Sequence, residues 1–196
     1  MTTRIPTTPT GHHPELAELP SHAMTPIAAK ALAVLRIATG IVFLWAFLDK
    51  TFGWHYSTVG DAAWIKGGSP TEGFLSHVEV GPFQSWFRSI AGAGWADWLF
   101  MLGLLGIGVA LVTGVAVRLA ALAGAALMAL MWFAEFPSAQ TDSTGAPTGS
   151  TNPLTDYHFI YALVLVVLAL TYSGTTWGLG KRWARLPFVS KHRWAQ

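Results

Sequence analysis

The chain has 196 residues, of which 52% are hydrophobic and only 11% are charged. Since about 25% of a typical soluble domain is charged, 12 Lys and Arg with 10 Asp and Glu are too few to coat a soluble globule of this size. These proportions exclude an ordinary cytosolic enzyme and a disordered chain. They predict an all-α integral membrane protein that contacts the lipid bilayer.

The sequence contains no cysteine. Disulfides, thiol catalysis, zinc fingers, Cys-ligated iron–sulfur clusters and c-type haem are therefore excluded, and any redox role needs another carrier. We expect no metal, haem or iron–sulfur cluster. The basic residues of segment 181–196 indicate membrane topology rather than a nucleic-acid site, because no aromatic-interleaved basic patch occurs elsewhere.

Residues 1–26 are rich in Thr, Pro and His and contain no apolar run. This composition predicts a disordered cytoplasmic tail rather than a signal peptide. His12, His13 and His22 could bind a metal, but nothing predicted there fixes their geometry. We interpret them as ordinary tail histidines.

A transmembrane helix needs about 20 mostly apolar residues, and four segments of the chain qualify. They define a four-helix bundle within residues 27–180, in which Asn152 and Pro153 suit the start of the fourth helix. The predicted spans are 27–48, 98–117, 119–136 and 153–174.

The distribution of Lys and Arg predicts the orientation of these spans. Lys30, Arg118 and the tail 181–196 lie on one side, whereas loop 137–152 has no basic residue and segment 49–97 has more acidic than basic ones. Because basic residues favour the cytoplasmic side, we expect both termini inside and both long loops outside, in the plasma (inner) membrane.

The two long loops differ in composition. Loop 137–152 is rich in Gly, Ser, Thr and Pro, which predicts flexibility. In segment 49–97, Ser69–Glu72 is typical of a capping box, and Gly81-Pro82 precedes a second short amphipathic stretch. We expect short helices that lie on the outer interface or cap the bundle, the second with one apolar face formed by Phe83, Trp86, Phe87 and Ile90.

Small residues recur at every fourth position in the second and third spans. Such stripes let helix backbones approach closely in lipid. Because a very short turn joins these two spans, we predict a tightly packed antiparallel hairpin. The stripes are Gly106, Ala110 and Gly114 in one span, and Ala121, Ala125 and Ala129 in the other.

Arg36 lies inside the first predicted span. A cation in hydrocarbon costs about 2.5–3.5 kcal/mol on insertion scales unless it is paired or reaches water. Two interpretations remain open: the side chain snorkels to the inner interface, or it holds a buried ligand. Gly40, Phe43, Phe47 and Lys50 share its helical face.

Acidic and basic side chains gather where the predicted topology places the outer helix ends. Such a cluster could exchange protons, although paired charges at a membrane rim are also common without function. A quinone would suit this place, because it needs apolar walls for its ring and a donor or acid near each carbonyl. The cluster consists of Asp49, Lys50, Glu135, Asp156 and His158.

Several stretches resemble one family of membrane proteins, DoxX/DoxD, over about residues 30–183. The resemblance implies a four-helix bundle. Similarity to the actinobacterial branch of the family further implies oxidation of thiosulfate to tetrathionate, with the electrons passed to membrane quinone. The similar stretches are Arg36-x-x-x-Gly40-x-x-Phe43 with Lys50, Trp64–Phe74, Gly114–Ala121, and Asn152-Pro153 with Asp156, His158 and Tyr161.

On this resemblance we predict a quinone-linked oxidoreductase subunit. Lys50 and Arg88 would attract the sulfur anion, and Asp156 and His158 would handle protons together with Glu135 and Asp49. The quinone would contact Arg36, Gly40, Phe43, Phe47 and Tyr161. The alternative is a non-catalytic membrane subunit that recruits or stabilises a respiratory or redox complex.

Overall fold

The computed structural model describes residues 24–79, 81–142 and 144–195. Within these residues the chain is mainly helical and contains no strand beyond one isolated bridge between Thr141 and Pro147. The all-α prediction is therefore confirmed. The tail histidines His12, His13 and His22 lie outside the described residues.

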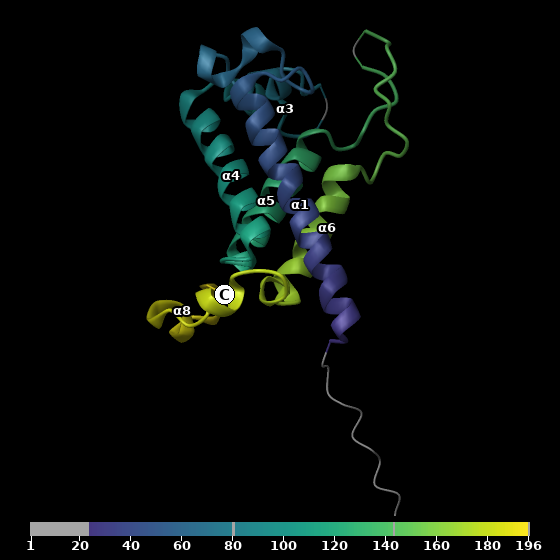
Figure 1. The fold of residues 1–196 in the computed structure, drawn as a ribbon. Helices are drawn as coiled ribbons and strands as arrows, with labels where there is room; N and C mark the ends of the chain where they lie inside the picture. Colours follow the sequence, from purple (N-terminus) through teal and green to yellow (C-terminus); the bar gives the residue numbers. More distant parts are fainter. Residues whose placement is uncertain (1–23, 80, 143, 196) are drawn as a thin grey trace, which may run out of the picture.

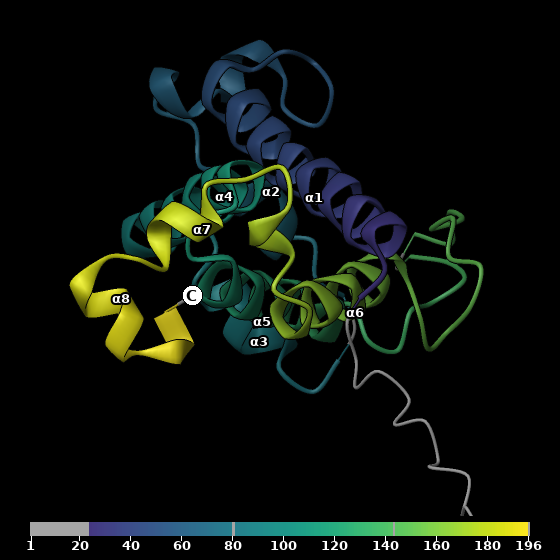
Figure 2. The same cartoon turned by 60° about the horizontal axis from the view of Figure 1, so that its bottom comes forward.

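Four antiparallel helices form the bundle (Figure 1): α1 (Pro26–Phe52), α4 (Gly94–Thr113), α5 (Val117–Ala134) and α6 (Tyr157–Leu170). The most extensive contacts are those of α1 with α4 and of α5 with α6. The view turned toward the tail end shows these two pairs facing each other (Figure 2). Helices α1, α4 and α5 are long and apolar enough to cross a membrane, whereas α6 has 14 residues and is shorter.

Short elements cover both ends of the bundle. At one end, here called the loop end, lie η1 (Gly60–Ala62), η2 (Trp64–Lys66), α2 (Glu72–Leu75) and α3 (Gln84–Ser89). At the other, the tail end, lie η3 (Ser173–Thr175), α7 (Gly180–Trp183), α8 (Pro187–Lys191) and η4 (Arg193–Ala195).

The two short helices expected between the first and second spans are present as α2 and α3. The hydroxyl of Ser69 accepts a hydrogen bond from the Glu72 N–H at 3.1 Å, as a capping residue does. The expected apolar face of α3 is only partly covered, because Phe87 is buried while Phe83 and Trp86 remain exposed.

The predicted start of the fourth span is wrong by four residues. Helix α6 begins at Tyr157, and the Asp156 carboxylate caps it by accepting from the Phe159 N–H at 3.0 Å. The Asn152 side chain instead accepts from the backbone N–H groups of Leu154 and Thr155, which forms a turn before the helix. At 1.5 Å per residue, α6 is about 21 Å long, shorter than a hydrocarbon core of about 30 Å.

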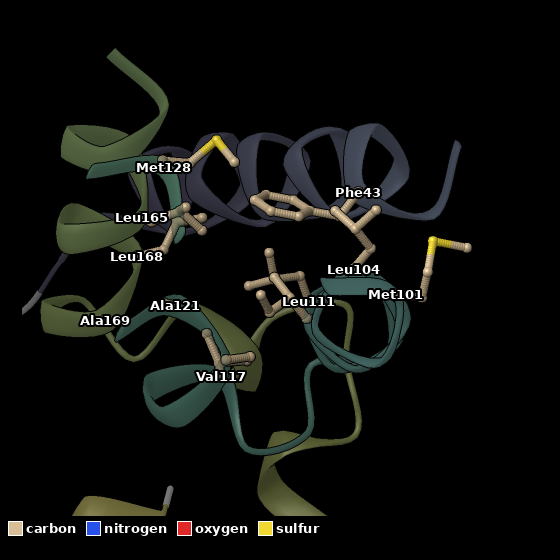
Figure 3. Close-up of a cluster of buried hydrophobic side chains, with 12 residues drawn as sticks. Phe43, Met101, Leu104, Leu111, Val117, Ala121, Met128, Leu165, Leu168 and Ala169 are labelled. Atoms are coloured by element: carbon tan, nitrogen blue, oxygen red, sulfur yellow. The ribbon is translucent and has the colours of Figure 1, made fainter. Parts of the chain in front are cut away.

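The core is formed by side chains from all four bundle helices. Phe43 of α1 lies against Leu104 and Leu111 of α4, and Met128 of α5 lies near Leu165 of α6 (Figure 3). The remaining residues of this buried cluster are Met101, Ile107, Val117, Ala120, Ala121, Leu168 and Ala169.

The close helix approach is not where the small-residue stripes predict it. Gly106 is exposed, and a Cβ built on it would meet no atom within 4 Å. A Cβ on Gly40 would lie 2.9 Å from Leu111 Cβ, and a Cβ on Gly108 would lie 2.6 Å from Leu44 Cγ. The tight backbone contact is therefore between α1 and α4, while α4 and α5 are less closely packed neighbours.

Arg36 ties the tail end together. Its side chain is fully buried, and Nη1 donates to the carbonyl oxygens of Leu111 at 2.5 Å and Val112 at 3.3 Å. Nη2 donates to the carbonyl oxygens of Thr176 at 3.1 Å and Trp177 at 3.0 Å. The last carbonyls of a helix lack intrahelical partners, so Arg36 satisfies the end of α4 and joins it to the segment after α6.

Gly114 makes this arrangement possible. It ends α4 in the left-handed conformation with φ of 76°, which glycine adopts without a steric penalty. A Cβ at this position would lie 2.8 Å from Nη1 of Arg36. The guanidinium is thus fully buried at the level of the last turn of α4, where protein carbonyls rather than water are its partners.

Replacing Arg36 tests its role in the bundle. Arg36→Met keeps much of the volume but leaves four carbonyls without their donor, so we expect the free energy of unfolding in detergent to fall by about 3 kcal/mol. Denaturant titration followed by tryptophan fluorescence measures the change. Lys30→Met, at an exposed position of α1, is the control and should change it by less than about 0.5 kcal/mol. Equal stability of Arg36→Met and wild type would contradict this role.

Substitutions at two glycines distinguish the observed contact between α1 and α4 from the contact that the small-residue stripe predicts. Gly40→Val inserts a branched side chain against Leu111 and Val112 and should reduce stability by about 1–3 kcal/mol or more. Gly106→Val faces open space and should not destabilise the bundle. The unfolding temperatures of the two variants, measured in the same detergent, test this prediction. A lower unfolding temperature for Gly106→Val than for Gly40→Val would contradict the assigned packing.

Candidate functional site at the loop end

A cavity of about 660 Å³ occupies the half of the bundle nearest the loop end. All four bundle helices contribute to its walls, and residues from the segment that contains α2 and α3 form a roof. Most lining side chains are aliphatic or aromatic, among them Phe43, Phe74, Phe87, Phe100, Leu104 and Met128. This size and composition are those of pockets that bind small, largely apolar molecules.

A few polar side chains line the same cavity. Lys50 comes from the end of α1, and its Nζ lies 5.9 Å from the centroid of the Phe100 ring. His158 and Tyr161 come from the first turns of α6. The cavity thus combines aromatic walls with a cation, an imidazole and a phenol.

His158 is held in a defined orientation. Its side chain is 2% exposed, and Nδ1 lies 2.6 Å from a carboxylate oxygen of Asp156. Tyr157 packs on the imidazole with ring centroids 4.0 Å apart. In the tautomer in which Nδ1 donates to the Asp156 carboxylate, Nε2 is free to accept a hydrogen bond. No described residue bonds Nε2.

Glu135 extends this pair toward the surface. Its carboxylate lies 4.0 Å from Nδ1 of His158, and its side chain is 45% exposed. The pKa of Glu135 is raised above its ordinary value, mainly by burial. A protonated His158 opposes this rise, and the Asp156 charge adds to it. Glu135, Asp156 and His158 therefore connect the cavity to the outside through groups that can carry protons.

The same three residues could hold a metal ion. Their ligand atoms all lie within 4.8 Å of one another. One imidazole with two carboxylates is a donor set that suits Fe²⁺, Mn²⁺ or Zn²⁺. The sequence analysis expected no metal, and it treated these residues only as acid–base groups.

Asp49 lies beside Lys50 in sequence but is directed elsewhere. Its buried carboxylate accepts from the N–H of Tyr56 at 3.2 Å, and from the N–H and hydroxyl of Ser57 at 2.9 and 2.8 Å. Asp49 is not among the residues that line the cavity. It anchors the segment that follows α1.

The residues expected to contact a quinone are separated. Phe43 and Tyr161 line the cavity, together with Lys50 and His158. Arg36 lies at the tail end, Gly40 faces α4, and Phe47 packs against the hydrophobic core without lining the cavity. These three residues therefore do not meet Phe43 and Tyr161 at one site.

Two charged residues of the loop end, one expected at the site and one not, have structural partners. Arg88 donates from Nε to the Val78 carbonyl at 2.8 Å, which fixes α3 against the preceding turn rather than beside Lys50. The sequence analysis missed Asp97, whose buried carboxylate accepts from the Ser69 hydroxyl and from the N–H and hydroxyl of Thr71. An acidic residue in the first turn of an apolar span was the available signal.

A model of the DoxX family matches residues 31–135, which is more than half of the chain. The matched range includes Lys50 and Glu135, whereas Asp156, His158 and Tyr161 lie beyond it. Neither the curated proteins nor the solved structures include a match.

Asp156 has two structural tasks that substitutions can separate. Asp156→Ala removes both the helix cap and the partner of His158, and should lower the free energy of unfolding by about 1–2 kcal/mol. Asp156→Asn keeps a good capping group and should retain most of this stability. Denaturant titration in detergent is the measurement, with Asp61→Ala at an exposed site as control. Equal losses for Asn and Ala would show that capping is not what Asp156 provides.

Proposed function

The chain belongs to the DoxX family of membrane proteins, and from this premise we propose that it is a quinone-linked oxidoreductase subunit whose cavity binds the quinone ring. The observation that carries the proposal is the aromatic cavity lined by a buried His158, whose Nδ1 is held by Asp156 and whose Nε2 has no partner among the described residues. A flat, apolar ring with two carbonyl oxygens suits such a space.

The polar groups of the cavity match the two states of a quinone. The Lys50 ammonium can donate to a carbonyl oxygen, and Nε2 of His158 can accept a hydrogen bond from a quinol hydroxyl. Reduction adds two electrons and two protons to the ring. In the reverse direction, His158 takes up a quinol proton, and Asp156 stabilises the resulting imidazolium.

Glu135 supplies a route for these protons. It lies within 4.0 Å of Nδ1 of His158 and is partly exposed, so protons can pass between the cavity and water without crossing lipid. We place this end of the bundle outside the plasma membrane, on the distribution of Lys and Arg.

We extend the proposal to thiosulfate as the electron donor, on the sequence resemblance. Two thiosulfate ions join through a new S–S bond to form tetrathionate and release two electrons, which reduce one quinone with two protons. Lys50 is the lining cation that could attract the anion. The alternative is a subunit that binds quinone without catalysing this oxidation.

Quinone binding by the purified protein tests the proposal. A tailless naphthoquinone should quench tryptophan fluorescence in a saturable manner. His158→Phe, which removes one hydrogen-bonding group, should weaken binding by up to about tenfold. His77→Phe is the matched control, because His77 is exposed and does not line the cavity. Equal binding by both variants would exclude His158 from the site.

A turnover assay distinguishes a catalytic subunit from one that only binds quinone. Wild-type protein incubated with thiosulfate and quinone should form tetrathionate and quinol in equal amounts. Saturable binding without turnover would favour the non-catalytic subunit, and absence of binding would overturn the quinone site itself.

A further inference from the structure

Part of the cavity is covered toward the loop end. Pro70, Thr71 and Phe87 are buried there and line its roof. Asp97 fastens the roof to α4 through Ser69 and Thr71, with hydrogen bonds of 2.6 to 2.9 Å. On the far side of the roof, Phe83 contacts Phe133 of α5 with ring centroids 5.4 Å apart. The cover is incomplete, because Trp86 of α3 also lines the cavity and is 51% exposed.

The cavity also reaches the surface between α4 and α5. Leu99 of α4 is 68% exposed and Leu130 of α5 is 54% exposed, and both also line the cavity. Ala123 and Ala126 of α5 are likewise both exposed and lining. Opposite them lies Gly103, on which a Cβ would meet no atom within 4 Å. We call these five residues the slot.

The depth of the slot determines what surrounds it. Its residues lie between one and three helical turns from the loop end of α4 and α5, which is about 6–16 Å at 1.5 Å per residue. The hydrocarbon core of a bilayer is about 30 Å thick, so the slot opens onto acyl chains rather than onto headgroups or water.

We propose that this slot is a lateral opening through which a polyprenyl quinone passes from the bilayer, with its ring beside His158 and its tail remaining between α4 and α5 in lipid. The inference rests on the proposed quinone site and adds the class of quinone and its route. Small side chains at Gly103, Ala123 and Ala126 leave room for an unbranched run of isoprene units, and the apolar rim requires no polar partner.

A phospholipid is a less suitable occupant of the same opening. Its phosphate would be drawn into a space whose lining offers one cation, Lys50, among mostly apolar side chains. Desolvating a charged headgroup there is unfavourable, whereas a quinone ring carries only two carbonyl dipoles.

Tryptophan substitutions can close the slot without touching His158 or Lys50. Gly103→Trp and Ala126→Trp place an indole in the opening. Matched controls are Gly106→Trp and Ala129→Trp, on the same two helices at exposed positions that do not line the cavity. The experiment uses the full chain in nanodiscs loaded with a long-tailed naphthoquinone, and quinone retained after repurification is extracted and quantified by chromatography.

The expected result is that the two slot variants retain about tenfold less long-tailed quinone than wild type, while both controls retain the wild-type amount. A tailless naphthoquinone, added in detergent and measured by equilibrium dialysis, should bind all five proteins within about twofold, which also shows that the variants are folded.

If the slot variants retain as much quinone as wild type, the lateral route is overturned and the quinone site is left intact. Failure of wild type to bind either quinone would overturn the proposed function. Recovery of phospholipid in place of quinone would overturn the assigned occupant.

Discussion

The bundle depends on one buried guanidinium that satisfies carbonyl groups lacking other donors. In hydrocarbon no water replaces a missing hydrogen bond, so both a cation and an unpaired carbonyl are costly there. Arg36 reduces both costs, because its Nη1 donates to the end of α4 and its Nη2 to the chain after α6, while its buried Nε has no partner among the described residues. This closes the tail end, and the space that remains in the bundle lies toward the loop end.

Buried and partly buried carboxylates around that space have different structural roles. Asp49 and Asp97 each accept three hydrogen bonds from the segment between α1 and α4, and so fix the roof to two helices. Asp156 instead caps α6 and holds His158 at the cavity. Acidic residues that look equivalent in the sequence thus divide into those that fasten the roof and one that orients a side chain for chemistry.

The roof and the slot lie at different parts of the cavity wall. Residues fastened to α4 cover part of it toward the loop end, and the slot between α4 and α5 is the opening that we assign to lipid. The looser packing of α4 against α5 is then a property of the site, since the close contacts of the bundle lie between α1 and α4 and between α5 and α6. Proton exchange through Glu135 and quinone passage through the slot would use separate faces of one cavity.

The sequence by itself determined the number of bundle helices and their order, because apolar runs, caps and a short turn are local properties. It also placed Lys50, Glu135 and His158 at one end, since consecutive helices in a bundle run antiparallel. The tertiary structure decided the direction of each side chain. Neighbouring residues on a helix point about 100° apart, so Lys50 faces the cavity while Asp49 does not. For the same reason Gly40 and Gly108 form the close contact while Gly106 faces outward, and only the packing of α1 on α4 brings Arg36 to carbonyls far along the chain.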